Sequence, residues 1–285
     1  MKGVHTALVT PFAADGTVDL DAYTRLAERQ IAAGIHGLVA CGTTGETPTL
    51  ERDEWRAIVR TTVSLAGGKI PVTAGVGTNC TRTTLANLEE AAGLGVDAGL
   101  MVFPYYNKPN PAGLRAHVAQ AAGVGLPLVL YHVPGRTGQR LSPSLLAELA
   151  DVDGVVAVKE ATGDLHFGGD VLRRTQTPVL SGDDFTFLQL LAAGGRGVIS
   201  VVSNVAPAQT VAVYTHHTAG RVEEAAVGLR ALWDLITFLF SDTNPTPCKA
   251  VLAELGLCST AVRLPLAPYE GPSPAPILEA LGLTG

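Results

Sequence analysis

Eight short apolar runs alternate with longer segments of helical periodicity along the chain, and glycine or proline bounds each run. The runs are nearly continuous in apolar character, as parallel strands are when helices cover both faces of their sheet. Strands that alternate with helices in this way indicate repeated βαβ units, and eight such units close into a barrel. We therefore predict an α/β protein with a (β/α)8 TIM barrel. The predicted strands are Val4 to Val9, Gly37 to Cys41, Pro71 to Val76, Ala98 to Phe103, Pro127 to Tyr131, Val155 to Lys159, Pro178 to Leu180 and Gly197 to Val201.

The segments between the runs have the pattern of one-sided helices. Asp21 to Ala33 and Arg52 to Leu65 both place their apolar residues on one side. An open doubly wound sheet is the competing architecture, but it normally carries a G-x-G-x-x-G turn after its first strand. The corresponding turn here reads TPFAADG, which favours the closed barrel.

The character of the chain changes after Pro207. Val222 to Phe240 and Pro247 to Leu255 read as consecutive helices with no strand between them. We expect residues 1–206 to hold the barrel strands and most of the barrel helices. Residues 207–285 would add the last barrel helix and a C-terminal helical extension within the same structural unit.

Charge and hydropathy exclude two classes of partner. The formal net charge is -6, and the scattered lysines and arginines form no basic stripe for a nucleic acid. No apolar run reaches the roughly 18 residues of a membrane helix. Met1 to Val9 is too short for the apolar region of a signal peptide. We therefore expect a cytoplasmic protein that binds neither nucleic acid nor membrane.

The cysteines and histidines do not have the spacing of a metal site. His216 and His217 are adjacent, so on a helix they would point about 100° apart. The cysteines form no C-x-x-C pair, which predicts reduced thiols and no bound metal. They are Cys41, Cys80, Cys248 and Cys258.

Lys159 is the most informative single residue. Barrel active sites form at the carboxyl ends of the strands, and VVAVKEATG places this amine at the end of an otherwise apolar run. Burial there would favour the neutral amine, which can attack a carbonyl carbon. The alternative is a structural ion pair with Glu160 or another carboxylate. The other lysines look different, since they are terminal, in loops or on a late helix: Lys2, Lys69, Lys108 and Lys249.

Further polar residues end neighbouring runs. Tyr131 can shuttle protons or serve as a core tyrosine. Thr43 and Thr44, between glycines, can offer hydroxyls and successive N–H groups to a carboxylate, although GTTG alone is also typical of a turn with a helix cap. Arg136 can bind a second carboxylate bidentately or be a solvated loop residue. Together they favour a site for an anionic carbonyl compound.

Two aspartates follow the seventh run. Asp183 and Asp184 precede a helical segment, and an N-cap role for one of them is favoured over acid–base catalysis.

These residues lie in motifs that resemble the Schiff-base aldolase family to which dihydrodipicolinate synthases and N-acetylneuraminate lyases belong. The resemblance spans nearly the whole chain, and the order and spacing of the motifs make it specific. The motifs are GTTGE at 42–46, PYYNKP at 104–109, YHVPGRTG at 131–138, KEATG at 159–163, SGDD at 181–184, GVISV at 197–201 and NPTPCK at 244–249.

The resemblance implies that Lys159 forms an imine with pyruvate, and that the resulting enamine attacks L-aspartate 4-semialdehyde to give 4-hydroxy-tetrahydrodipicolinate, a step of lysine and diaminopimelate biosynthesis. It implies a proton relay of Tyr131, Thr43 and Tyr106, with Tyr106 reaching in from a neighbouring subunit of a homotetramer. The implied substrate-binding residues are Thr44, Gly182, the backbone at Ile199 and, for the carboxylate of the semialdehyde, Arg136. No metal or organic cofactor is implied.

The chain departs from the family pattern in two places. His132 stands where the synthase motif usually has asparagine, which is compatible with a supporting position or with a paralogue that takes another aldehyde. Arg52, Trp55 and Thr83 stand where family members inhibited by lysine commonly carry histidine, lysine or acidic residues. Added positive charge there would bind an ammonium poorly, so we predict weak or absent lysine inhibition.

Two alternative functions remain at this stage. One is another Schiff-base aldolase or dehydratase of the same family, acting on a sugar acid or a hydroxy-oxo acid. Arg136 argues against the sialic-acid lyases, which usually lack this arginine. The other is a non-catalytic barrel that binds an oxo acid, but such a protein has no physical reason to keep a costly amine in an apolar strand.

Overall fold

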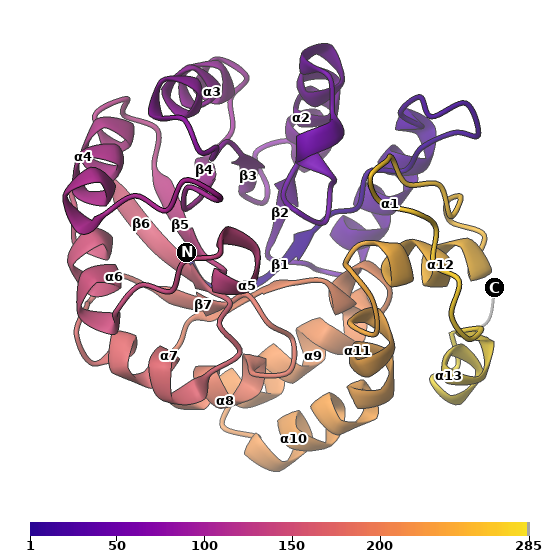
Figure 1. Cartoon of the computed structure of the whole chain (residues 1–285). Coiled ribbons are helices and arrows are strands. Elements are labelled where there is room, and N and C mark those ends of the chain that lie inside the picture. Colours follow the sequence, from indigo (N-terminus) through magenta and orange to yellow (C-terminus); the bar gives the residue numbers. More distant parts are fainter. Residues whose placement is uncertain (284–285) are drawn as a thin grey trace.

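The computed structural model describes residues 1–283 and contains a closed barrel of eight strands (Figure 1). Each strand pairs in parallel with the next, and the eighth closes onto the first. The prediction of a (β/α)8 barrel is confirmed. The strands are β1 (Gly3–Ala7), β2 (Gly37–Ala40), β3 (Val72–Gly75), β4 (Ala98–Val102), β5 (Leu128–His132), β6 (Val155–Glu160), β7 (Val179–Ser181) and β8 (Gly197–Ser200).

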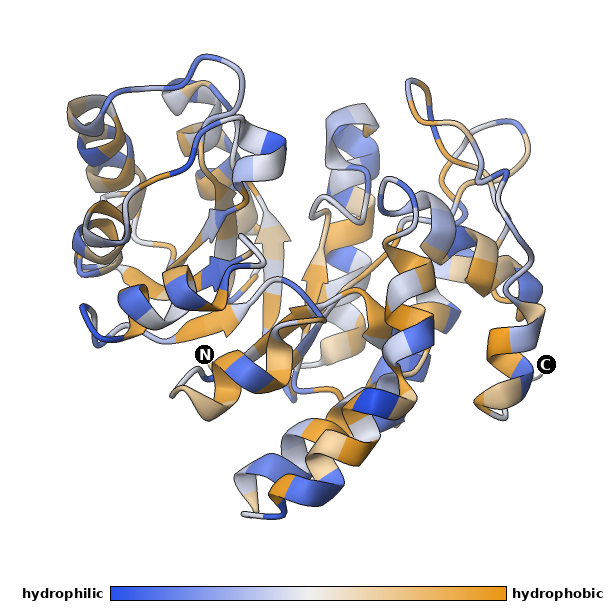
Figure 2. Ribbon diagram, turned by 60° about the horizontal axis from the view of Figure 1, so that its bottom comes forward, coloured by the Kyte–Doolittle hydropathy of each residue, from blue (hydrophilic) through white to orange (hydrophobic). Residues whose placement is uncertain are grey.

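Helices surround the barrel as an outer layer. In Figure 2 the strands are mostly hydrophobic, whereas the helices carry both hydrophobic and hydrophilic residues, as expected of helices with one face on the barrel. Two short 3-10 helices, η1 (Thr47–Thr49) and η2 (Val202–Asn204), follow β2 and β8. The helices of this layer are α1 (Leu20–Ala32), α2 (Arg52–Ala66), α3 (Thr81–Gly93), α4 (Pro111–Ala122), α5 (Pro134–Thr137), α6 (Pro143–Ala150), α7 (Leu165–Leu172), α8 (Phe187–Ala192) and α9 (Pro207–Thr218).

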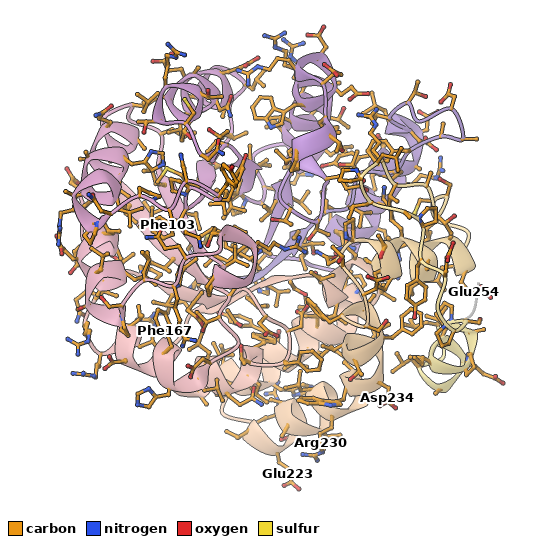
Figure 3. All side chains as sticks on the ribbon, viewed as in Figure 1. Phe103, Phe167, Glu223, Arg230, Asp234 and Glu254 are labelled. Atoms are coloured by element: carbon orange, nitrogen blue, oxygen red, sulfur yellow. The ribbon has the colours of Figure 1, made fainter. Side chains whose placement is uncertain are left out.

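The C-terminal extension is helical, as predicted, but its helices are shorter. It comprises α10 (Val222–Ala231), α11 (Trp233–Leu239), α12 (Thr246–Glu254) and α13 (Ala275–Ala280). The single helix expected over 222–240 is wrong, because the N–H of Leu232 bonds to the carbonyl of Leu229, three residues back, and tightens the turn. The break lets α10 pack on α9 while α11 packs on α12 and α13. Charged side chains on α10 to α12, among them Glu223, Arg230 and Glu254, lie at the outer edge of the molecule (Figure 3).

The apolar core has two parts. The larger part fills the space between the strands and the helices. The smaller part lies inside the barrel and includes Val129, Tyr131, Ala157, Leu180 and Ile199. Because side chains alternate across a strand, this inner group identifies which residues of each strand point towards the barrel axis. None of the helices within residues 1–283 combines the length and the apolar character needed to cross a membrane.

Candidate active site

The amine of Lys159 and the ring of Tyr131 lie together at the carboxyl end of the barrel interior. Ala157 points inward, so Lys159, two residues on, points inward as well. The two strands are in register at this level, where Tyr131 pairs with Lys159. Lys159 Nζ lies 4.2 Å from the centroid of the Tyr131 ring, and the lysine is only 5% exposed. Strand register therefore brings the predicted nucleophile beside the predicted proton carrier.

Lys159 is not held by an ion pair. Glu160 is the next residue and points to the opposite side of β6, towards Gly168 of α7. There its Oε1 accepts a hydrogen bond from the N–H of Thr162 at 2.7 Å, and burial raises the pKa of its carboxyl. Within residues 1–283 no salt bridge joins Lys159 to a carboxylate. The alternative of an ion pair with Glu160 is wrong.

Gly182, directly after β7, makes room for the lysine side chain. A Cβ atom at this position would lie 2.9 Å from both Cγ and Cε of Lys159 and 2.7 Å from Cβ of Ala161. These separations are below van der Waals contact, so a larger residue would displace the lysine. Gly182 thus lies directly beside the aliphatic part of the Lys159 side chain.

The GTTGE turn presents unpaired backbone donors. Its N–H groups at Gly45 and Glu46 donate to the carbonyls of Gly42 and Thr43, which closes the turn. The N–H groups of Thr43 and Thr44 donate to no atom of the described chain. Two consecutive free N–H groups in a turn form a concave site for an anion. This geometry fits the expectation that the turn binds a carboxylate.

A cavity of about 520 Å³ opens at this end of the barrel. Thr43, Tyr131 and Arg136 line it, together with the predicted lysine-site residues Arg52 and Trp55. The guanidinium of Arg136 donates to the carbonyl of Asn244 at 3.1 Å and has no carboxylate partner among the described residues. Its charge is therefore available to an anionic ligand.

Five of the predicted site residues are not among those that line this cavity: Lys159, Tyr106, Thr44, Gly182 and Ile199. Ile199 is 0% exposed and belongs to the same inner apolar cluster as Tyr131. Tyr106 is 89% exposed, does not line the cavity and has a left-handed backbone with φ of 71°. A single chain therefore does not bring Tyr106 to the site.

Asp183 and Asp184 do not cap the following helix, so that expectation is wrong. The N-cap of α8 is Thr186, and its side chain makes no capping hydrogen bond within the described chain. Asp184 Oδ2 instead accepts from the N–H groups of Val201 and Val202, each at 2.9 Å. Its carboxylate ties the loop after β7 to the end of β8, a contact between distant segments that local helix signals do not indicate.

His132 lies outside the barrel, away from the cavity. It is fully buried between Phe103 and Phe167, with ring centroids 6.0 and 5.4 Å away, and its ring nitrogens have no partner among the described residues. Figure 3 labels both phenylalanines, which lie on the side covered by α4, α6 and α7. Burial lowers the pKa of His132 to about 4. The histidine that departs from the family motif therefore packs between strand and helices, on the side of β5 opposite to Tyr131.

A buried ion pair between Lys249 and Glu46 lies behind the GTTGE turn and was not predicted from the sequence. Lys249 of α12 is 0% exposed, and its Nζ donates to Glu46 Oε1 at 2.5 Å and to the carbonyl of Ala261 at 2.8 Å. Burial lowers the pKa of Lys249, and the carboxylate of Glu46 opposes this shift. The sequence did offer a signal, because Lys249 stands in the apolar stretch TPCKAVLAE. A buried lysine almost always has a charged partner, so this position predicts an ion pair.

Residues 1–283 contain no group of three or more His, Cys, Asp or Glu side chains that could share a metal ion. The polar groups that line the cavity include a phenol, hydroxyls and a guanidinium, and the amine of Lys159 lies behind the phenol, 4.2 Å from the Tyr131 ring centroid. This set can form an imine, move protons and bind carboxylates.

Comparison with known proteins agrees with this chemistry. The model of the dihydrodipicolinate synthetase family matches residues 1–275. A 4-hydroxy-tetrahydrodipicolinate synthase from Maridesulfovibrio salexigens is 44% identical over 288 residues, which cover 100% of this chain and 98% of the relative. The dihydrodipicolinate synthase structure from Thermotoga maritima superposes with a TM-score of 0.97 at 41% identity and covers 99% of both chains. A monomeric dihydrodipicolinate synthase variant superposes equally well, with a TM-score of 0.97 at 41% identity over 99% of this chain and 97% of that one. The resemblance predicted from the motifs is confirmed, and the chain belongs to the dihydrodipicolinate synthetase family.

Proposed function

We propose that this protein condenses pyruvate with L-aspartate 4-semialdehyde to 4-hydroxy-tetrahydrodipicolinate through a Schiff base on Lys159. The observation that carries the proposal is the amine of Lys159, buried on the inner face of the barrel 4.2 Å from the Tyr131 ring centroid and free of any carboxylate partner in the described chain. An amine at this position can attack a carbonyl carbon that is held beside the Tyr131 phenol.

Lys159 Nζ attacks the ketone carbon of pyruvate, and loss of water leaves an imine. The imine withdraws electrons from the neighbouring methyl group, which then loses a proton to give an enamine. Tyr131 is the proton carrier for these steps, with Thr43 as the next member of the relay. The enamine carbon attacks the aldehyde carbon of the second substrate. The amino group of that substrate then attacks the imine carbon, which closes the ring and releases Lys159.

Two anion sites hold the two carboxylates. The free N–H groups of Thr43 and Thr44, with the Thr44 hydroxyl and the backbone at Ile199, bind pyruvate beside Lys159. Gly182 borders the pyruvate site through its contact with the lysine. Arg136 binds the carboxylate of the semialdehyde bidentately from the rim of the cavity.

The second substrate distinguishes this proposal from other aldolases of the family. The cavity is lined by the Arg136 guanidinium, which has no carboxylate partner among the described residues and can bind the carboxylate of aspartate semialdehyde. The position of His132 behind the strand removes it from contact with the aldehyde. Both features support aspartate semialdehyde.

Tyr106 completes the relay from a second copy of the chain. Its side chain is 89% exposed on a loop with left-handed backbone, an arrangement that supports insertion into a partner subunit. We propose a homotetramer built from pairs that exchange this tyrosine, and a single structural unit for residues 1–206 and 207–285. Sedimentation analysis of the wild type and Tyr106→Ala tests the assembly. The cytoplasmic location stays a prediction.

The substrate assignment is tested by steady-state turnover of pyruvate with aspartate semialdehyde, with a sugar-derived aldehyde and with hydroxy-oxo acids. We expect aspartate semialdehyde to give the highest kcat/KM. Arg136→Ala should raise KM for the semialdehyde and leave formation of the pyruvate imine intact, because it removes only the second carboxylate site. A preference for the sugar aldehyde would reassign the branch of the family.

A further inference from the structure

Asn244, just before α12, contacts one residue of each proposed carboxylate site, Thr44 for pyruvate and Arg136 for the semialdehyde. Its side chain is 8% exposed, and its Nδ2 donates to Thr44 Oγ1 at 2.9 Å. Its backbone carbonyl accepts from the guanidinium of Arg136 at 3.1 Å. Thr44 follows β2 and Arg136 follows β5, so one residue of the C-terminal extension joins two distant parts of the rim.

The extension holds Asn244 firmly against the GTTGE turn. Five residues on, Lys249 pairs with Glu46, which ends the turn. The N–H of Arg263 donates to the other oxygen of the same carboxylate at 3.0 Å. In Figure 1 the orange and yellow C-terminal segments lie beside α1 and the loops near it, in agreement with these bonds. The turn and the extension therefore form one connected polar network.

The direction of the bond to Thr44 decides what that threonine can do. A hydroxyl has one proton to donate and two lone pairs to accept with. Because the amide N–H of Asn244 occupies a lone pair, the proton of Thr44 remains available to another acceptor. Among the described residues, the bond from Nδ2 to Thr44 is the only hydrogen bond of the Asn244 side chain, and its Oδ1 atom has no partner there.

We propose that Asn244 is a positioning residue that orients the Thr44 hydroxyl as a donor to the pyruvate carboxylate and holds Arg136 for the second substrate. The proposal rests on the proposed function of the site. It makes the C-terminal extension part of substrate binding, although no side chain of the extension acts on the reacting atoms.

Asn244→Asp and Asn244→Ala distinguish this role from a merely structural one. Aspartate has the shape of asparagine but can only accept, so it would turn the Thr44 proton away from pyruvate and place a negative charge beside its carboxylate. Alanine only removes the bond. If Asn244 merely filled space, the isosteric aspartate would be the milder change.

The measurement is the pyruvate concentration that gives half-maximal borohydride trapping on Lys159, with KM for both substrates and the thermal midpoint. We expect Asn244→Ala to raise half-saturation by about tenfold, the effect of one hydrogen bond. Asn244→Asp should raise it by about a hundredfold, because two like charges approach in a partly buried site. The matched control is Thr246→Val. It removes a buried bond from the same segment, in which Thr246 Oγ1 donates to the carbonyl of Thr243 at 2.9 Å, and should leave both substrate constants within about twofold.

Thr44→Val supplies a second test that does not depend on the aspartate variant folding. In that background Asn244→Ala should raise half-saturation for pyruvate by no more than about twofold, since the hydroxyl it orients is absent. Equal effects of Asn244→Ala with and without Thr44, or an aspartate variant milder than alanine, would overturn the role of Asn244. Failure of the wild-type protein to form the adduct would instead remove the proposed function.

Discussion

Gly182→Ala isolates the fit between the barrel wall and the predicted nucleophile. The added methyl carbon would lie 2.9 Å from Cγ and Cε of Lys159. Ordinary carbon contacts are about 3.5–4.0 Å, so the lysine has to move by about 0.6–1 Å. The second obstacle is Cβ of Ala161, at 2.7 Å, which restricts movement of the new methyl group in the other direction.

Both stability and activity should respond to this displacement. Overpacking a closely fitted site costs about 1–3 kcal/mol of the free energy of unfolding. A misplacement of about 1 Å at the reacting atom costs about a hundredfold in rate. We therefore expect kcat/KM for pyruvate to fall by about a hundredfold, while the protein remains folded at room temperature.

The assay is steady-state turnover with urea denaturation of the same samples. Gly169→Ala is the matched control, because it adds the same methyl group within α7, where no described atom outside the helix's own backbone lies within 4 Å. Alanine favours a helix over glycine, so this variant should keep wild-type turnover and gain about 0.5–1 kcal/mol. Turnover of Gly182→Ala within about threefold of wild type would refute the account of the lysine's fit.

Three further predictions follow from buried and charged groups. Lys249→Met leaves Glu46 buried without its partner and should cost about 3–5 kcal/mol in urea denaturation, whereas adding Glu46→Gln should recover part of that loss. The pKa of His132 is about 4 in the folded protein and 6.5 in the unfolded chain. Above pH 6.5 the residue is neutral in both states and costs no stability. As the pH drops towards 4, the unfolded chain takes up a proton that the folded protein does not, so the free energy of unfolding falls by about 3 kcal/mol. His132→Phe should reduce this acid loss in denaturation curves measured across that range, and an unchanged pH dependence would contradict the assignment. Free lysine at low millimolar concentration should inhibit weakly or not at all. The Arg52 guanidinium lies over Trp55 and pairs with Glu90, so it repels a second cation at this wall of the cavity. A tenfold loss of activity would contradict this.

The sequence predicts the barrel well because each strand has its own local signal. All eight apolar runs became strands, with ends displaced by only a few residues. Lys159 and Tyr131 could be identified because a polar residue ending an apolar strand is conspicuous, and strand order then brings them together. Alternation along the strand also explains why Glu160 and His132, one residue further on, point away from the cavity.

Contacts between distant segments could not be predicted in the same way. Asn244 is 200 residues from Thr44, and neither local periodicity nor spacing relates them. Asp184 is a residue type that often caps helices, yet its Oδ2 accepts from the N–H groups of Val201 and Val202 just after β8, which are 17 and 18 residues away in the sequence. Tyr106 is 89% exposed in the single chain, so its proposed role in a neighbouring subunit stays a prediction.

The most direct test of the proposed chemistry is mass spectrometry after borohydride reduction with pyruvate. We expect a mass increase equal to reduced pyruvate, located on Lys159 and absent from Lys159→Ala. The buried Lys249, paired with Glu46, should carry no adduct. An adduct on Lys159 would establish the Schiff base. A folded wild-type protein without any adduct would contradict the central claim and favour a barrel that binds an oxo acid without catalysis.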